Sequence, residues 1–186
     1  MKQLGGYSVL FFLLGHAVDS SVTEECQALS LDILLKWLRS DANERHLFIA
    51  RRGHWMLRHL LETERCRPSK SFASVLINLS CSAPVTLTSG GKNFASVLHS
   101  DALVVDPDLL SFTVQCWKLW QRFPDRSPSF DGDTLDLLLR TLQHLLRDNH
   151  PHRQFNVRQM ERAKILPLLL HMATVSFIVN ILLDYR

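Results

Sequence analysis

Residues 6–14 read GYSVLFFLL and residues 53–61 read GHWMLRHLL, so the same design occurs twice, forty-seven positions apart. Both stretches open on glycine and carry leucine at the fifth, eighth and ninth places: Gly6, Leu10, Leu13 and Leu14, then Gly53, Leu57, Leu60 and Leu61. Leucines at this spacing line one side of an α-helix. A period of about 40–47 residues is typical of armadillo and HEAT arrays, in which neighbouring helices cover one another's apolar faces. We therefore predict an all-α chain, and arrays of this kind generally bind or space other proteins.

Composition supports a folded chain and gives little support to nucleic-acid binding. Of the 186 residues, 46% are hydrophobic and only 21% are charged, which is not the composition of a disordered protein. The net charge of +3 comes from 21 basic and 18 acidic residues mixed along the sequence, without a long basic stripe. The four cysteines include no C-x-x-C pair, so we expect buried reduced thiols rather than a zinc or redox motif: Cys26, Cys66, Cys81 and Cys116.

Both ends of the chain resemble export or membrane signals. Lys2 and the apolar run 9–14 before Gly15-His16-Ala17 have the form of a signal peptide, and Asn78 lies in a glycosylation sequon. A small secreted all-α protein with a cleaved leader is therefore the alternative interpretation. The repeat argues against it, because the same leucine pattern at residues 57–61 has no targeting role. At the other end the run 165–183 is barely long enough to cross a bilayer and contains Pro167, so we favour a packed or partner-facing helix.

Helix-start signals divide the first half of the chain. We expect a first helix over residues 7–18, a capping box at residues 21–24, and a second amphipathic helix after it. Asp41 and Ser69 are expected to cap two further helices, with the Gly53 helix between them. The apolar stripe predicted for the second helix consists of Val22, Cys26, Leu29, Ile33, Leu34, Trp37 and Leu38.

The second half opens with an interruption over residues 83–105, where we expect a loop or short hairpin. Asp106-Pro107 then starts a helix that carries Trp117 and Trp120, and a linker follows to Gly132. After it we expect a leucine-rich helix, a break at residues 149–152, and a final helical region capped by Asn156 with a kink at Pro167. The apolar face predicted for the leucine-rich helix consists of Leu135, Leu138, Leu139, Leu142, Leu145 and Leu146.

The sequence offers no catalytic constellation. It lacks a nucleophile elbow and a phosphate loop, and the histidines around Pro151 show no fixed third metal ligand, so we predict neither an enzyme, nor a cofactor, nor a metal site. The candidate partner-binding residues are apolar. Trp117 and Trp120 are spaced as neighbours on one helix face, with core packing as the simpler interpretation and a binding hot spot as the alternative. Phe177 and Ile178 belong to a terminal helix whose apolar residues exceed what one buried side accommodates.

Several short motifs, taken in order, carry a resemblance to a known family. They are Gly5-Gly6-Tyr7, Cys81-Ser82-Ala83-Pro84, Asp106-Pro107-Asp108-Leu109-Leu110, Trp117-Lys118-Leu119-Trp120, Asn149-His150-Pro151-His152 and Phe155-Asn156-Val157-Arg158-Gln159. Together they resemble the armadillo-like region of the very large BEACH-domain proteins, the lysosomal-trafficking-regulator branch first and the Alfy-like and neurobeachin-like branches next.

The resemblance implies a fragment or short form of a cytoplasmic, non-enzymatic scaffold for lysosomal or vesicle traffic or selective autophagy. Its implied partners are other proteins and the rest of a large parent protein, with peripheral association to endolysosomal or vesicle membranes and no nucleic acid. We expect residues 1–172 to form the armadillo-like repeat region and residues 173–186 to form a divergent C-terminal helix, because the motifs do not extend into it.

Overall fold

The computed structural model describes residues 5–20, 22–67, 69–88, 95–98, 100–116, 119–120 and 134–184, with the side chains of the last helix described as far as residue 174. These residues form helices and one small hairpin, in agreement with the predicted all-α class and with the predicted interruption over residues 83–105. The elements are α1 (Tyr7–Asp19), α2 (Glu24–Ser40), α3 (Ala42–Ala50), α4 (Gly53–Glu62), α5 (Lys70–Ser80), β1 (Thr86–Thr88), β2 (Ala95–Val97), α6 (Pro107–Gln115), α7 (Thr134–Leu146), α8 (Arg153–Arg162) and α9 (Ile165–Asp184). No helix in the described part of the chain is long and apolar enough to cross a membrane.

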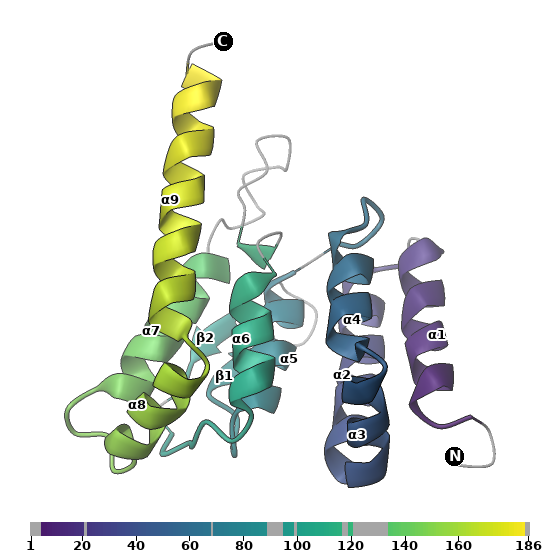
Figure 1. Cartoon of the computed structure of the whole chain (residues 1–186), viewed down its shortest axis with the longest axis horizontal. Helices are drawn as coiled ribbons and strands as arrows, with labels where there is room; N and C mark the ends of the chain where they lie inside the picture. Colours follow the sequence, from purple (N-terminus) through teal and green to yellow (C-terminus); the bar gives the residue numbers. More distant parts are fainter. Residues whose placement is uncertain are drawn as a thin grey trace.

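The chain runs across the molecule from α1 at one side, through α2 to α6, to α7, α8 and α9 at the other side (Figure 1). Helix α1 packs on α2, α2 on α5, α5 on α6 and α6 on α9, while α7 and α8 complete the C-terminal part. Helix α5 is central, because it also contacts α7 and the hairpin. Its buried residues accordingly lie on nearly all of its sides: Phe72, Ala73, Ser74, Leu76, Ile77, Leu79 and Ser80.

Four helices begin where short polar side chains cap them. Asp41, Ser69 and Asp106 accept hydrogen bonds from the free amides of α3, α5 and α6, as the sequence predicts. Helix α2 is capped by Thr23, whose hydroxyl accepts from the Cys26 amide, so the predicted start at residue 21 is two residues too early. Such capping bonds are local, which explains why they could be read from the sequence.

The two repeated glycines pack against neighbouring turns of the same helix, α3. Gly6 precedes α1 with a φ of 61°, and a side chain there would overlap the Glu44 carboxylate, which accepts a hydrogen bond of 2.7 Å from the Tyr7 amide. Gly53 begins α4, and a side chain there would overlap the Phe48 ring. In each copy, the missing side chain of the glycine therefore lets the backbone at the start of the helix approach α3 closely.

The leucines of the repeat are divided between core and surface. Leu10, Leu14, Leu57 and Leu61 are buried, whereas Leu13 is exposed. Leu60 is half-buried against the core. In each copy, the first and last leucines are therefore the ones that are fully part of the core.

The predicted apolar stripe of α2 is partly wrong. Leu34 and Leu38 are buried as expected, but Cys26, Leu29 and Ile33 are exposed, and the buried side instead includes Gln27, Ala28, Leu31 and Leu35. The buried face of α2 differs from the predicted one because α2 lies between α1 and α5, which together set its buried side.

Gln27 is fully buried and bonds the backbone of residues 22, 65 and 67, so a polar side chain joins the start of α2 to the α4–α5 connection.

Asn156 is not the helix cap that the sequence suggested. It lies inside α8, fully buried, and its amide oxygen accepts a 2.9 Å bond from the Val104 amide. Its nitrogen donates to the carbonyls of Ala102 and Leu145 at 3.2 Å. The side chain therefore joins α8 to the end of α7 and to the strand-like segment before α6.

The buried face of α7 also differs from the predicted one. Leu135 and Leu139 are exposed, while Leu137, Thr141 and His144 are buried.

The expected kink of a helix at Pro167 does not occur. The chain breaks earlier, where Lys164 adopts a φ of 53°, and α9 begins at Ile165. Pro167 then lies in the first turn of α9, where a residue without an amide hydrogen is tolerated. The proline thus helps to start a helix rather than bending one.

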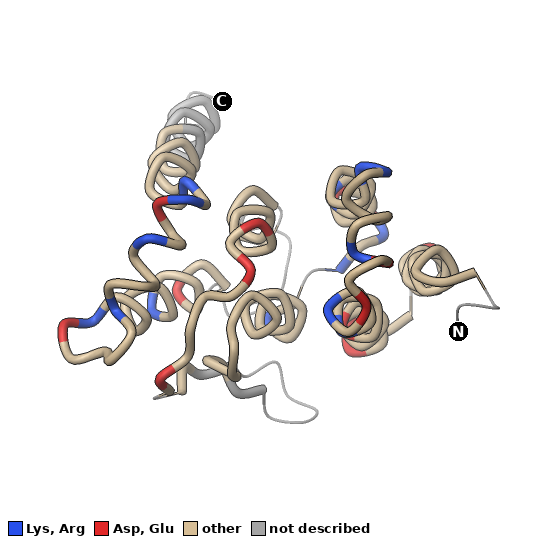
Figure 2. The backbone as a smooth tube through the Cα atoms, turned by 60° about the horizontal axis from the view of Figure 1, so that its bottom comes forward, with Lys and Arg blue, Asp and Glu red and all other residues tan. Residues whose placement is uncertain are grey.

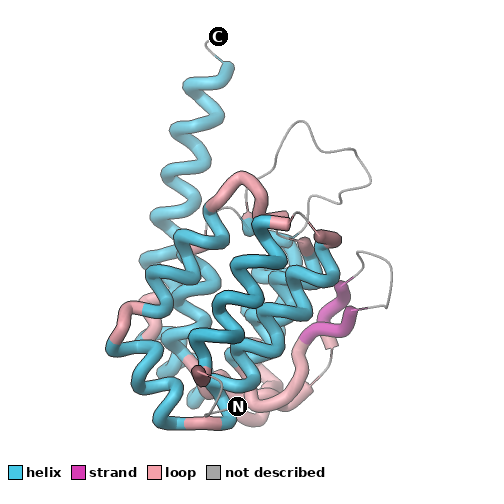
Figure 3. The backbone as a smooth tube through the Cα atoms, turned by 90° about the vertical axis from the view of Figure 1, so that its right-hand side faces the viewer, coloured by secondary structure: helices cyan, strands magenta, loops and turns pink. Residues whose placement is uncertain are grey.

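The hairpin lies at one edge of the helical body (Figure 3). Strands β1 and β2 pair antiparallel, with Thr86 opposite Val97. Asn78 of α5 holds the hairpin, because its oxygen accepts from the amides of Val85 and Thr86 and its nitrogen donates to the Thr86 carbonyl. The Ser74 and Thr86 hydroxyls are also hydrogen bonded.

Candidate functional site

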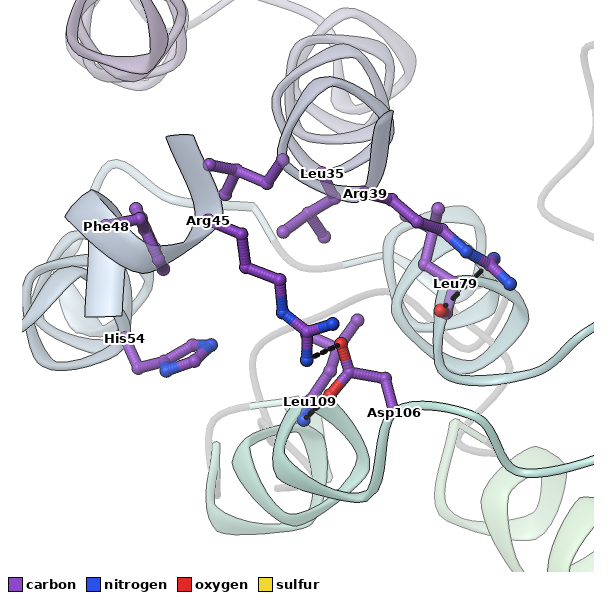
Figure 4. A pocket seen from close by; sticks show the side chains of 9 residues that line it. Leu35, Arg39, Arg45, Phe48, His54, Leu79, Asp106 and Leu109 are labelled. Carbon is purple, nitrogen blue, oxygen red and sulfur yellow. Dashed lines mark hydrogen bonds and ion pairs between the residues drawn. The ribbon is translucent and has the colours of Figure 1, made fainter. Parts of the chain in front are cut away.

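A small cavity of about 30 Å³ lies where α2, α3 and α4 meet α5 and α6 (Figure 4). Its lining is apolar on most sides but includes four ionisable side chains, so it is a candidate site for chemistry. The lining residues are Leu35, Leu38, Arg39, Arg45, Phe48, His54, Leu79, Asp106 and Leu109.

Asp106 and Arg45 form an ion pair at this cavity. One carboxylate oxygen of Asp106 accepts from the Leu109 amide at 3.0 Å, as the cap of α6. The other oxygen lies 2.9 Å from the Arg45 guanidinium of α3. Both side chains are partly exposed, so the pair contributes at most about 1 kcal/mol to stability. Both carboxylate oxygens therefore already have partners within the fold.

Arg39 binds the end of α5. Its guanidinium donates to the carbonyls of Leu79 and Cys81, the latter at 3.0 Å, and so satisfies acceptors that a helix end leaves open. Burial raises the pKa of the neighbouring Cys81 thiol to about 12, and the Arg39 charge opposes this shift. The thiol therefore stays protonated and is a poor nucleophile.

His54 lies between two aromatic rings at the same place. Its ring meets Phe48 edge-on at 5.1 Å and lies 5.9 Å from Phe112 of α6. Burial lowers the pKa of His54, the carboxylates of Asp106 and Asp108 oppose that shift, and Arg45 adds to it. His54 thus links α3, α4 and α6 as a neutral ring.

The cavity is suited to joining helices and not to holding a substrate. Small-molecule sites generally measure about 300–1,000 Å³, and this cavity is smaller by an order of magnitude. Its arginines and its aspartate are engaged with helix ends or with each other. No signal in the sequence pointed to Arg39, Arg45 or His54 as a group, because the contacts join segments about 40–60 residues apart.

A pH dependence of stability follows from His54. Its pKa is lower in the folded chain than the ordinary 6.5, so below that pH the unfolded chain binds more protons. We expect the free energy of unfolding to fall as the pH drops from about 6.5 toward the folded-state pKa. In urea titrations between pH 7.5 and 5.5, His54→Gln should show a smaller fall than the unmodified chain. His59→Gln, on the exposed side of the same helix, is the matched control; an equal effect of the two variants would contradict the assignment.

The predicted partner residues fall at different places. Trp117 lies outside the described residues. Trp120 follows α6 rather than belonging to it, and it is buried, with its indole nitrogen donating to the carbonyls of Thr113 and Val114. This burial agrees with the core-packing interpretation of Trp120. Phe177 and Ile178 belong to α9, but their side chains lie outside the described set, so their partner role stays a prediction.

The histidines near Pro151 form a small cluster. The rings of His144 and His150 are 6.0 Å apart, and those of His150 and His152 are 6.2 Å apart. His144 bonds to the backbone of Ser100 through its Nε2 atom. Among the described residues, no group of three or more histidine, cysteine or acidic side chains is placed to hold a metal ion. The cluster therefore closes the α7–α8 turn over the segment that contains Ser100.

Three of the four cysteines are buried, as expected, and one is not. Cys66, Cys81 and Cys116 are buried, whereas Cys26 lies on the exposed side of α2. Burial raises the pKa of Cys116 to about 12, with smaller contributions from nearby charges. Neither Cys81 nor Cys116 has the lowered pKa that a reactive thiol requires.

Comparison with known proteins points to one kind of protein. The chain is 30% identical over 174 residues, 94% of its length, to the lysosomal-trafficking regulator of Drosophila melanogaster. It is 24% identical over 166 residues, 89% of its length, to that of Homo sapiens. The chain is similar to a segment of these regulators. It spans only 5% and 4% of their lengths.

The match agrees with the resemblance to BEACH-domain proteins, while the branch of that family stays a prediction. No protein-family model matches the chain. No solved structure is similar to it at a significant level.

Proposed function

We propose that this chain is a segment of a BEACH-domain protein of the lysosomal-trafficking-regulator branch, and that it serves as a non-enzymatic scaffold for protein–protein contacts. The observation that carries the proposal is the similarity to two regulators along nearly the whole chain. The proposed setting is the cytoplasm, at the surface of endolysosomal or vesicle membranes, with the rest of a large parent protein as one partner. A role in selective autophagy is an extension of the same proposal.

An armadillo-like solenoid is the proposed arrangement. Support comes from the chain of contacts that runs across the molecule from α1 to α2, from α2 to α5, from α5 to α6 and from α6 to α9 (Figure 1). The repeated glycines give further support, because both let helices approach α3 closely. In such arrays each repeat of two or three helices contacts only the neighbouring repeats, and extended surfaces remain open for partners.

A chimaera tests the proposed function. The segment of the fly regulator that matches this chain is replaced by the 186 residues, and the chimaera is expressed in cells that lack the regulator. We expect lysosome size and distribution to return to the values that the intact regulator gives. The matched control carries a Gly-Ser linker of equal length in place of the segment. A chimaera that is stable and abundant but restores no more than the linker control would contradict the proposal.

The rival interpretation, a secreted protein, is tested separately. A glycan on Asn78 would displace the side-chain bonds that hold the hairpin, and cleavage after Ala17 would remove Leu10 and Leu14 from the core. We therefore expect the chain, made in secreting cells, to keep its first seventeen residues and to carry no sugar on Asn78. Intact-mass analysis measures both, and a shortened or glycosylated product would favour the secreted protein.

A further inference from the structure

The outer side of α4 carries an exposed stripe that the core does not use. Trp55, Met56 and His59 lie on the exposed side of the helix and Arg52 is exposed just before its first residue, while the repeat residues Gly53, Leu57 and Leu61 are buried. Trp55 is 65% exposed and Met56 is 41% exposed. The Trp55 and His59 rings are stacked at 5.6 Å. Trp55 and Met56 are adjacent, so they form an exposed apolar pair that the core of this chain leaves uncovered.

Basic residues predominate around this stripe, although α4 ends with Glu62 and the exposed Glu64 follows it. The sequence contains no aspartate or glutamate from Arg45 to Leu61, although it contains four arginines there. Arg45 pairs with Asp106 and Arg58 with Glu62. Arg51 and Arg52 are exposed, and the described residues give them no ion-pair partner. Basic residues are visible on α3 and α4, whereas the neighbouring helix α1 shows none (Figure 2).

The turn that holds these arginines has a defined shape. Arg52 adopts the left-handed conformation, with a φ of 57°, which side chains other than glycine rarely take. Its amide donates to the Ile49 carbonyl at 3.0 Å, and its carbonyl accepts from the Met56 amide at 3.1 Å. Ile49, before the turn, is 44% exposed. The turn therefore places two arginines between exposed apolar side chains.

The size and chemistry of this surface favour a membrane over a protein partner. The stripe is about 10 Å long, from the rise of 1.5 Å per residue, which is short for a protein interface of about 800 Å² per partner. Tryptophan is enriched at the membrane–water interface, and arginines beside it attract anionic lipid. Helix α1 makes the contrast clear, because its exposed Val9, Phe12 and Leu13 are apolar without any arginine or lysine in the helix.

We propose that the outer side of α4 is a peripheral contact site for an anionic lipid bilayer. Trp55 and Met56 enter the headgroup region, and Arg51 and Arg52 pair with the phosphates and carboxylates of the lipids. This site rests on the membrane setting of the proposed function and gives it a defined surface. It is separate from the proposed protein–protein contacts, so the lipid site can fail while the scaffold role holds.

Vesicle sedimentation with the complete chain tests the site. The probes are vesicles of phosphatidylcholine alone and vesicles with about a third phosphatidylserine. We expect binding to need the anionic lipid and to weaken with rising salt. The double variant Arg51→Gln with Arg52→Asn should weaken binding by about fivefold for each arginine removed. Trp55→Ser should weaken it by about tenfold, since an aromatic anchor at the interface is lost. The fluorescence of the chain should shift to shorter wavelength on binding, and Trp55→Phe should abolish that shift.

Two variants elsewhere provide matched controls. Arg158→Gln with Arg162→Gln removes the same charge from exposed positions on α8, and Phe12→Ser removes a larger exposed fraction of an aromatic side chain from α1. Both should bind the anionic vesicles as the unmodified chain does. Equal weakening by these controls, equal binding to neutral vesicles, or absence of vesicle binding would overturn the proposal. Binding of a soluble acidic amphipathic peptide to this side, without vesicle binding, would assign the surface to a protein partner.

Discussion

Gly53→Ala is expected to lower the free energy of unfolding by about 2 kcal/mol, because overpacking of a filled core costs about 1–3 kcal/mol. The added methyl group would overlap the ring of Phe48. That ring cannot move away easily. It is 1% exposed and meets Tyr7 edge-on at 5.5 Å and His54 edge-on at 5.1 Å.

The chain contains a suitable control for this prediction. Gly15 lies inside α1, where a methyl group would meet nothing within 4 Å. Alanine favours a helix interior over glycine by about 0.5–1 kcal/mol, so Gly15→Ala should raise stability. Urea denaturation of both variants measures the difference. If Gly53→Ala is as stabilising as Gly15→Ala, the Phe48 ring does not fill the space beside Gly53, and the explanation of the repeated glycines is wrong.

A double variant separates crowding from other effects of the methyl group. Phe48→Leu shortens the side chain that the methyl group would meet. If crowding is the cause, Gly53→Ala should cost less in the Phe48→Leu background than in the unmodified chain. An equal cost in both backgrounds would place the effect in the backbone of α4 instead.

The sequence predicts the helices well because the signals that start and end them are local. Asp41, Ser69 and Asp106 bond to amides two or three residues further along the chain. Glu44 has the spacing of a capping box with Asp41, so local reasoning predicts that its carboxylate bonds the Asp41 amide. Its carboxylate instead bonds the Tyr7 amide, thirty-seven residues away. Local spacing alone does not distinguish these two outcomes.

Hydrophobic spacing predicts that a helix is amphipathic more securely than it predicts which face is buried. In α2, leucines and isoleucine occur on most sides, so several stripes fit the sequence. The neighbours α1 and α5 select the one with Leu31 and Leu35, and they leave Leu29 59% exposed. Trp120 shows a related error. Its spacing predicts a position on the helix after Asp106, but α6 ends at Gln115 and the Trp120 indole bonds back to the last turn of α6.

The candidate site could not be predicted for the same reason. Arg45, His54 and Asp106 come together only when α3, α4 and α6 pack. None of them lies in a motif with a known chemical role. The exposed stripe on α4 lies between the repeat residues of the second copy, on the opposite side of the helix from Leu57 and Leu61. Whether Trp55 and Met56 are exposed depends on which side of α4 packs on the core, and the spacing of residues in the sequence does not show this.

Asn156→Ala is expected to lower the free energy of unfolding by about 3 kcal/mol, the largest loss we expect from a single polar side chain here, because each buried polar group left unpaired costs about 1–3 kcal/mol. The side chain is fully buried and makes three hydrogen bonds to the backbone of Ala102, Val104 and Leu145. Without it, the Val104 amide loses its acceptor in a place that water does not reach. The amide of Val104 should therefore exchange its hydrogen much faster in the variant.

The matched control for this prediction is Asn149→Ala, because Asn149 is exposed in the turn before α8. A substitution at such a surface position generally changes stability by less than about 0.5 kcal/mol. Denaturation gives the two free energies, and hydrogen exchange followed by mass spectrometry gives the rate at Val104. A global loss of stability with unchanged relative protection at Val104 would mean that Asn156 acts by filling space. A selective loss at residues 102–104 would show that this one amide joins the segment before α6 to α7 and α8, a link that no periodic pattern in the sequence could have revealed.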